Sequence, residues 1–440
     1  MLGLFIPKHQ VLTMKSETTI EVQGSVAPGF ELVREAFACL WLESELGASI
    51  CVYDQGRKVV DLWAGFKDAK REDPWLADTL VNVYSTTKGM AATAIAVLFD
   101  EGLIDYCAPV SLYWPEFGAA GKAQITVAEL LSHKAGLSAV TQPLTVKDLY
   151  DWQKMTNLIA AQTPLWPPGR HSGYHPVTWG YLPGELIRRI TGMTMGEYFN
   201  IKVATPLNAD CFIGLPDSEH LRCATLNGPN RAVIPTQTNI NNKGKTNLQV
   251  AATQSPRIKE NQKENQKENQ KENQKENQKE NQKQNSTELY RLSMLNPVIS
   301  PFKHACSPAW RRAEIAASNG HASARGLAKV YGALSMNGSI GGINVLSREA
   351  IDAATRSEVE TTPDLVMNTV IRRSRGFILN TDGNFGPNKN AFGHNGAGGS
   401  TAFADRENGV SMSYVMNQML SDSVNEPRAN RLTKALYQCI

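Results

Sequence analysis

Several signatures of common enzyme classes are missing from this 440-residue sequence. It contains no G-x-S-x-G nucleophile elbow, no H-E-x-x-H zinc motif, no Walker phosphate loop and no G-x-G-x-x-G after a predicted strand. No C-x-x-C pair occurs among its seven cysteines, which argues against a zinc ribbon or a thioredoxin-type redox site. Any chemistry must therefore be sought in less common patterns.

The chain also lacks an excess of charge of one sign and a long apolar run. The 45 Lys and Arg residues nearly balance the 42 Asp and Glu residues, which is not typical of proteins that bind nucleic acid or a membrane surface. No stretch approaches the ~20 apolar residues that span a bilayer, and the short apolar start has no basic region before it. Seven widely spaced cysteines, an odd number, indicate free buried thiols in a reducing compartment. We expect a cytoplasmic protein with no nucleic-acid partner and no membrane span, while its oligomeric state is left open.

Hydrophobic periodicity predicts regular structure at both ends of the chain. We expect a helix over about 29–46, followed by a β-hairpin over 48–63 with a Gly-containing turn. Towards the other end, the expected helix, three strands and final helix cover 322–331, 376–379, 401–405, 411–417 and 428–437. The dipeptide Asn408-Gly409 is a hairpin turn signal between the last two strands. The pattern predicts an α+β fold whose antiparallel sheet is built from the N- and C-terminal segments, flanked by helices, with an inserted helical lobe.

These elements divide the chain into four expected parts. An N-terminal tail covers 1–20, the sheet region combines 21–84 with 322–440, and the helical lobe combines 85–235 with 289–321. The fourth part, 236–288, contains a Lys-Glu-Asn-Gln repeat with a strict period of four from Lys259 to Lys283. Because no apolar residue interrupts this repeat, it cannot supply a core. We expect a surface insertion without chemistry, either disordered or a solvated helix.

The segment Ser85-Thr86-Thr87-Lys88 is the sharpest candidate for chemistry, at the start of a helix expected over 84–102. A serine hydroxyl needs a base, and positions i and i+3 share one face of a helix. This helix is apolar nearly all round, so it should be buried, and burial would push the pKa of Lys88 down. The motif S-x-x-K is short, and a second copy occurs at Ser300-Pro301-Phe302-Lys303. We interpret that copy as a chance match, because no buried apolar helix follows it.

Two further segments would complete such a site. Tyr174, after the Pro167-Pro168-Gly169 breaker, would act as a base if a cation such as Lys88 favoured its phenolate. A tyrosine that merely packs is an equally good interpretation, and Tyr181 lies nearby. The glycine-rich segment 392–400 would bring backbone N–H groups beside a strand to form an oxyanion hole, unless it is an ordinary glycine turn.

Taken together, these segments resemble the serine β-lactamase and penicillin-binding-protein superfamily. The resemblance is to its class C-like branch, which contains family VIII carboxylesterases and β-lactamase-domain proteins. Outside the insertion it runs from about Gly24 to Asn417. Besides the S-x-x-K segment it rests on the stretches 130–137, 174–180, 184–192, 319–325 and 394–400.

The resemblance implies a role for each residue of the site. Ser85 would attack a carbonyl and form an acyl-enzyme, and Lys88 and Tyr174 would share the proton transfers. The backbone N–H groups of Ser85 and Ala397 would hold the oxyanion, while His394, Gly396 and Ala397 would bind the substrate. No metal or organic cofactor is implied.

Two departures from the superfamily pattern bear on the substrate. The second motif, usually Tyr-x-Asn or Ser-x-Asn, is Tyr174-His175-Pro176, and the third begins with His394 in place of the lysine that binds a substrate carboxylate. Because histidine is largely neutral at pH 7, we expect weak carboxylate anchoring, and hence neutral esters as better substrates than β-lactams. We therefore predict a carboxylesterase-type serine hydrolase for carboxylic esters or short acyl substrates. An acyltransferase, a small-peptide peptidase and a non-catalytic scaffold of the same fold stay open as alternatives.

Overall fold

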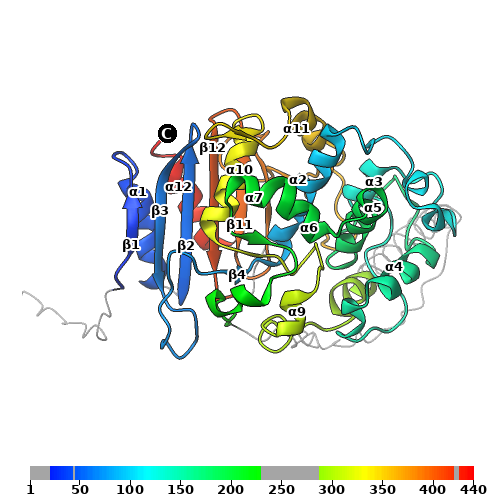
Figure 1. Cartoon of the computed structure of the whole chain (residues 1–440), viewed down its shortest axis with the longest axis horizontal. Coiled ribbons are helices and arrows are strands. Elements are labelled where there is room, and N and C mark those ends of the chain that lie inside the picture. The colour runs from blue at the N-terminus through cyan, green and yellow to red at the C-terminus, as the bar shows by residue number, and fades with distance from the viewer. Residues whose placement is uncertain (1–19, 43–44, 229–286, 421–425) are drawn as a thin grey trace, which may run out of the picture.

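The computed structural model describes residues 20–42, 45–228, 287–420 and 426–440 (Figure 1). The tail expected over 1–20 and the insertion expected over 236–288 lie almost entirely outside the described residues. The expectations about both segments therefore stay predictions.

A seven-stranded antiparallel sheet forms from both ends of the chain, as the sequence predicts. Its strand order is β1-β3-β2-β12-β11-β10-β9, so β2 and β12 join the two ends, with Met412 opposite Val52. The N-terminal strands are β1 Gln23–Val26, β2 Gly47–Asp54 and β3 Arg57–Gly65. The C-terminal strands are β9 Ile378–Leu379, β10 Phe392–Asn395, β11 Thr401–Asp405 and β12 Val410–Met416.

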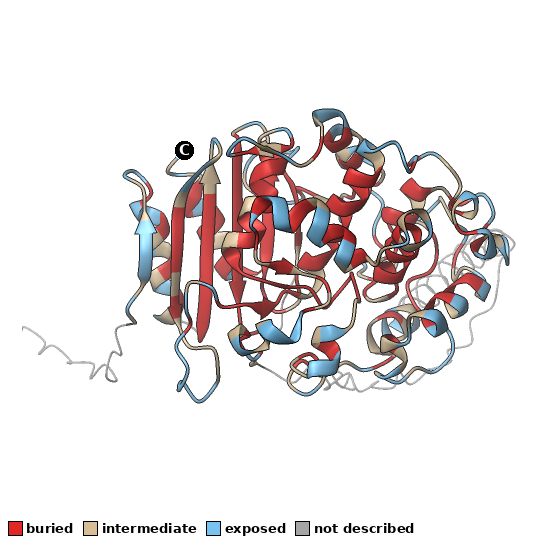
Figure 2. Cartoon of the chain, in the orientation of Figure 1, coloured by how far each residue is buried: buried red, intermediate tan, exposed pale blue. Residues whose placement is uncertain are grey.

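Helices cover both faces of this sheet, which explains why β2 and β12 are buried along almost their whole length (Figure 2). Helix α10 (Ala324–Ser335) packs against β2, β11 and β12. Helices α1 (Glu31–Ala38) and α12 (Pro427–Leu436) pack against each other on the opposite face (Figure 1). Because both faces of the sheet are covered, even the serines of these two strands, Ser49, Ser411 and Ser413, are buried.

The predicted hairpin is confirmed, whereas the first predicted helix is too long. The turn between β2 and β3 places Gln55 and Gly56 at φ of 46° and 73°, and positive φ at both central residues is typical of a two-residue hairpin turn. The helix expected over 29–46 ends at Ala38 and continues as a 3₁₀ turn, Cys39–Leu42. In this turn Trp41 still packs against the core, whereas Leu42 is exposed.

Helix α2 (Thr87–Asp100) runs through the centre of the molecule. Every residue from Thr87 to Leu98 is buried, Lys88 included, as a sequence that is apolar nearly all round predicts. The predicted helix start differs, because Tyr84–Thr86 forms a 3₁₀ turn before the α-helix begins. Gly102, at φ of 70°, stands just after the helix and provides the predicted stop.

The remaining elements form the helical lobe and the parts that connect it to the sheet. The helices of this part are α3 Val127–Leu131, α4 Trp152–Ala161, α5 Tyr181–Thr191, α6 Met195–Phe199, α7 Thr205–Leu207, α9 Pro308–Arg312 and α11 Arg348–Thr355. The short strands β4 Val81–Asn82, β6 His321–Ala322 and β5 Cys211–Phe212 make a three-stranded sheet, and β7 Ser339–Ile340 pairs with β8 Ile343–Asn344. None of the described helices is both long and apolar enough to cross a membrane.

The cysteines are free, but the expectation that all are buried is wrong. Cys39 and Cys107 are exposed, and Cys306 and Cys439 are partly so. Cys39 is the first residue of the 3₁₀ turn that follows α1. Cys107 lies in a surface turn, where its N–H donates to the Asp105 carboxylate. Neither position faces the core.

Candidate active site

The turn that carries Ser85 is held firmly between β4 and α2. Strand β4 pairs with β6, and the Asn82 side chain donates to the carbonyls of Ser318 and Gly320 at 3.0 Å each. Tyr84 takes a φ of 44°, a conformation that is uncommon for a residue other than glycine. Ser85 itself is half-buried, whereas the helix that follows is buried from Thr87 to Leu98.

Three polar side chains meet at this turn. The Tyr174 hydroxyl donates to Ser85 Oγ at 2.5 Å, and Lys88 Nζ lies 3.4 Å from Ser85 Oγ and 3.1 Å from Tyr174 Oη. The structure thus brings together the three residues that the sequence singled out. Tyr181, the other tyrosine considered, is buried in α5 and donates to the Leu149 carbonyl at 2.7 Å.

Lys88 has no carboxylate partner among the described residues. Its Nζ donates to the carbonyls of Pro176 at 3.0 Å and Ala317 at 2.9 Å. Burial, helped by the positive charge of Arg373, lowers the pKa of Lys88 well below its usual 10.5. A neutral amine has two N–H groups, which donate hydrogen bonds to these two carbonyls. Its lone pair is then available to accept the proton of the Ser85 hydroxyl.

Tyr174 is a proton donor in this arrangement rather than a phenolate. Burial raises the pKa of Tyr174 to about 12, and the hydrogen bond with Ser85 and the charge of Arg373 offset only part of that rise. The expectation that a charged Lys88 would favour the phenolate is therefore not met, because the buried amine gives up its own charge first.

The backbone around Tyr174 is fixed by hydrogen bonds on both sides. Asp364 Oδ1 accepts from the Tyr174 N–H at 3.0 Å, and His133 Nδ1 accepts from the next N–H, that of His175, also at 3.0 Å. His175 Nδ1 bonds to the Gly173 carbonyl at 2.5 Å. Burial lowers the pKa of His175 to about 3 and that of His133 well below its usual value, so both imidazoles are neutral supports.

A buried ion pair beside Tyr174 was missed by sequence reasoning. Arg373 Nη2 donates to Asp364 Oδ2 at 2.6 Å, and both side chains are almost fully buried. The Arg373 guanidinium carbon lies 5.3 Å from the centre of the Tyr174 ring. Three arginines occur at 372, 373 and 375, and no local pattern shows which of them turns inward.

The glycine-rich segment is joined directly to the Ser85 turn. A Cβ at Gly396 would lie 2.2 Å from the Val83 carbonyl oxygen and 2.2 Å from Ser400 Oγ, so only glycine fits. Ser400 Oγ donates to the Val83 carbonyl at 2.8 Å and lies 3.1 Å from Thr86 Oγ1. These contacts hold the segment to residues on both sides of Ser85.

The backbone donors expected to hold an oxyanion are free of other partners. Within the part of the chain that the structure describes, neither the Ser85 N–H nor the Ala397 N–H donates a hydrogen bond. Ala397 is half-buried, like Ser85. Two unpaired N–H groups near a reachable hydroxyl are what an oxyanion hole requires.

His394, the first residue of the third motif, is buried and uncharged. Its Nδ1 bonds to the Asn395 carbonyl at 2.8 Å, and burial, followed by the charge of Lys88, lowers its pKa well below the usual range. The imidazole therefore offers no positive charge to a substrate carboxylate. A direct role of His394 in substrate binding stays a prediction.

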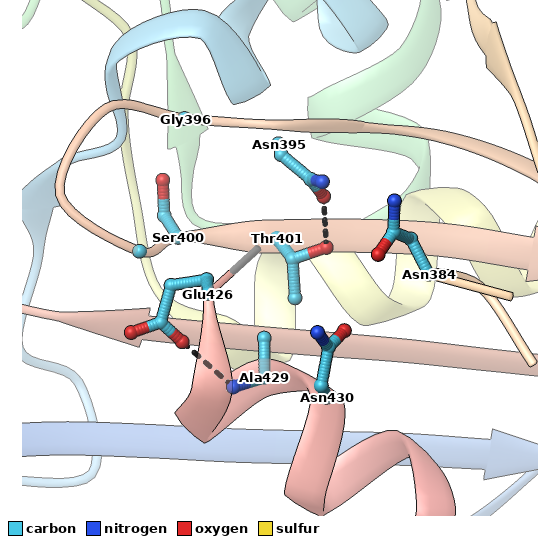
Figure 3. A pocket seen from close by; sticks show the side chains of 9 residues that line it. Asn384, Asn395, Gly396, Ser400, Thr401, Glu426, Ala429 and Asn430 are labelled. Carbon is cyan, nitrogen blue, oxygen red and sulfur yellow. Dashed lines mark hydrogen bonds between the residues drawn. The ribbon is translucent and has the colours of Figure 1, made fainter. Parts of the chain in front are cut away.

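Helix α12 contacts the glycine-rich segment. A small pocket, with the Asn395, Thr401 and Asn430 side chains in its wall, lies between this segment and the start of α12 (Figure 3). Thr401 Oγ1 donates to Asn395 Oδ1 at 2.6 Å, which fixes the end of β10. Arg428 of α12 donates to the Gly398 carbonyl at 2.8 Å.

The fold and this cluster of side chains define a hydrolase of the β-lactamase/transpeptidase-like class. The chain belongs to the beta-lactamase family, whose model matches residues 34–436. It is 35% identical over 404 residues to the protein named esterase/beta-lactamase LipL of Mycobacterium tuberculosis, a match that covers 92% of this chain and 84% of that protein.

Two solved structures are similar over nearly the whole chain. A family VIII carboxylesterase shares 42% identity with a TM-score of 0.81, over 96% of this chain and 100% of that one. A penicillin-binding protein homologue from Caulobacter crescentus shares 37% identity with a TM-score of 0.80, over the same shares of the two chains. The predicted superfamily and fold are confirmed.

Proposed function

We propose that this enzyme hydrolyses carboxylic esters and related short acyl substrates through an acyl-enzyme on Ser85. The observation that carries the proposal is the contact of Ser85 Oγ with Tyr174 Oη at 2.5 Å and with Lys88 Nζ at 3.4 Å. A reachable hydroxyl beside a buried neutral amine is an activated nucleophile. The names of two similar proteins, an esterase/beta-lactamase and a family VIII carboxylesterase, support an ester substrate.

Acylation begins with proton transfer from Ser85 to Lys88. As the proton passes to Nζ, Ser85 Oγ forms a bond to the ester carbonyl carbon, and negative charge develops on the carbonyl oxygen. The N–H groups of Ser85 and Ala397 hold that charge, which is stabilisation made mostly in the transition state.

The leaving group takes its proton from Tyr174. The bond between the carbonyl carbon and the alcohol oxygen breaks, and the Tyr174 hydroxyl protonates the departing oxygen. Lys88, now an ammonium 3.1 Å away, returns the proton to Tyr174. A water molecule then attacks the acyl-enzyme with the same groups as base and acid, releasing the carboxylic acid and restoring the Ser85 hydroxyl.

The third motif is evidence for a preference for neutral substrates. In the superfamily that the sequence resembles, a lysine at this place binds a substrate carboxylate, whereas His394 is buried and uncharged. An anionic β-lactam therefore gains little here over a neutral ester. We expect a higher kcat/KM for p-nitrophenyl butyrate than for nitrocefin, and the opposite order would contradict this preference.

The test is turnover of p-nitrophenyl acetate and butyrate by the wild type and the Ser85→Ala variant. Loss of the nucleophile should lower kcat by about 10³-fold or more. Ser300→Ala, in the second S-x-x-K copy, is the matched control, because the Lys303 side chain is exposed and cannot act as a buried amine. Intact-mass spectrometry of quenched wild type should show the acyl group on Ser85, and turnover retained by Ser85→Ala would refute the proposal.

The same preparation separates hydrolysis from acyl transfer. Added alcohol or amine acceptors compete with water for the acyl-enzyme, and an acylated acceptor is detected by mass spectrometry. We expect the free carboxylic acid as the main product at millimolar acceptor. A predominance of acylated acceptor would identify a transferase that uses the same site.

A further inference from the structure

We propose that Arg373, held by Asp364, is a positioning residue whose fixed positive charge acts on the reaction through Lys88. The inference rests on the proposed function, because it concerns the base of that reaction. It assigns a role to a buried ion pair that neither belongs to the three sequence motifs nor touches Ser85.

Arg373 and Lys88 lie close to the same aromatic ring. The Arg373 guanidinium carbon is 5.3 Å from the centre of the Tyr174 ring, and Lys88 Nζ is 4.8 Å from it. The two cationic centres are therefore no more than about 10 Å apart. Because the side chains of Arg373 and Lys88 are both almost fully buried, water and salt screen this repulsion only weakly.

The backbone keeps Arg373 at this place. Its N–H donates to the Val359 carbonyl at 3.0 Å, and its own carbonyl accepts from the N–H groups of Glu358 and Val359. The guanidinium therefore projects inward from a segment that is tied down just before β9. A charge fixed in this way cannot move away when Lys88 gains a proton.

Within the described part of the chain, the Arg373 guanidinium has one carboxylate partner and an unused N–H group. Its guanidinium bonds to Asp364, but its buried Nε finds no partner among the described residues. Arg428, the other fully buried arginine, contrasts with it. Arg428 bonds to the carboxylates of Glu45 and Glu426 and to two backbone carbonyls, so its charge and N–H groups are used in anchoring.

Asp364 shares its charge among several donors. Its Oδ1 accepts from the N–H groups of Tyr174, Val366 and Met367 at 2.9–3.0 Å, and only Oδ2 faces Arg373. The carboxylate thus holds the guanidinium and the Tyr174 backbone in one arrangement. Part of the positive field of Arg373 is left to act on Lys88.

The other titratable groups that face Lys88 carry no charge at neutral pH. They are His133, His175, His394 and Tyr174. Burial lowers the pKa of each imidazole and raises the pKa of the phenol. Arg373 and Asp364 are therefore the charged side chains among the described residues around Lys88. After burial, the positive charge of Arg373 lowers the pKa of Lys88 further, which agrees with the geometry.

The test is the pH profile of kcat/KM for p-nitrophenyl butyrate in four proteins: the wild type, Arg373→Gln, Arg373→Lys and Asp364→Asn. On the acidic limb Lys88 must lose its proton before it can accept one from Ser85. A unit charge about 10 Å away, at an effective dielectric of about 20, shifts a pKa by about one unit. Arg373→Gln should therefore move the acidic limb up by about one pH unit, whereas Arg373→Lys should leave it near the wild-type position.

Neutralising Arg373 and neutralising Asp364 should shift the acidic limb of the pH profile in opposite directions. Asp364→Asn leaves the Arg373 charge less balanced, so its acidic limb should move to lower pH. A purely structural ion pair would lower kcat/KM in both variants without moving the limb, or would move both limbs in the same direction. Either of those results would overturn the inference.

A double variant keeps the test decisive if a single charge left alone prevents folding. Arg373→Gln with Asp364→Asn replaces the ion pair by two amides, and its acidic limb should lie above that of the wild type by less than one unit. A limb at or below the wild-type position would overturn the inference. Turnover retained by Ser85→Ala would instead refute the proposed function, so the two failures are distinct.

Discussion

Substitution of Lys88 by methionine tests two effects of the buried amine, one on the free energy of unfolding and one on turnover. In the unfolded chain a lysine keeps its proton up to a pKa of about 10.4. In the folded protein burial lowers the pKa of Lys88, so the amine releases its proton at a lower pH. Between these two pKa values the unfolded state binds one more proton than the folded state. The free energy of unfolding of the wild type therefore rises with pH there by about 1.4 kcal/mol per pH unit.

The Lys88→Met variant lacks this proton and hence this slope. It also leaves the Ala317 carbonyl without the Lys88 donor, a loss of about 1–3 kcal/mol that does not depend on pH. The Pro176 carbonyl keeps a second donor, Ser318 Oγ at 3.1 Å. The diagnostic quantity is therefore the pH dependence of the difference between the two proteins, not its absolute value. That difference should grow in favour of the wild type as pH rises.

The assay is guanidinium unfolding of both proteins from pH 7 to pH 10 in steps of half a unit. Lys303→Met, which removes an exposed lysine, is the matched control for the substitution itself. Turnover by Lys88→Met should fall by about 10³-fold or more, because the base is lost. If the stability difference stays constant over the whole pH range, Lys88 keeps its proton in the folded state, and its assignment as the base is wrong.

Three other substitutions or labels test separate parts of the structure. Tyr174→Phe removes the hydroxyl but keeps the ring, so kcat/KM should fall by about 10²–10⁴-fold with little change in the thermal midpoint; unchanged kcat/KM would mean that the tyrosine only packs. Gly396→Ala places a Cβ 2.2 Å from the Val83 carbonyl oxygen and must displace the third segment from the Ser85 turn. We expect its kcat to fall by about 10²-fold, and full activity would show that this contact does not position the site. A thiol reagent should label the exposed Cys39 and Cys107 first and the buried Cys51 only on unfolding; fast labelling of Cys51 would contradict its burial.

The parts of the fold that were predictable are those that local sequence determines. Helix α2 is apolar on every face, so its burial follows from composition alone. The turn at Gln55 and Gly56 is short and glycine-containing, so the hairpin follows from its two flanking strands. Strand β10 was not predicted as a separate strand, because its glycine and histidine have little preference for a strand. Its strand form comes from pairing with β11 and β9.

The parts of the site that a short motif brings together were predictable. The parts that only the tertiary structure brings together were not. Ser85 and Lys88 are three residues apart, so their proximity follows from helix geometry. For Tyr174 the sequence left a packing role and a chemical role equally open, with Tyr181 nearby, and only the hydrogen bonds to Ser85 and to Leu149 tell the two tyrosines apart. The Pro176 and Ala317 carbonyls that bind Lys88 are backbone groups, which no residue pattern marks.

The charges around the site connect the buried ion pair with the choice of substrate. In the superfamily that the sequence resembles, the third motif supplies a lysine to the substrate; here His394 takes that place and is neutral. The fixed cation among the described groups near Lys88 is Arg373, and it is buried against Asp364 rather than turned to the substrate. Lys88 therefore experiences a positive field that favours its free amine, while the substrate meets no exposed positive charge from these groups. One arrangement thus supports both the proposed role of Ser85 and the proposed preference for uncharged acyl groups.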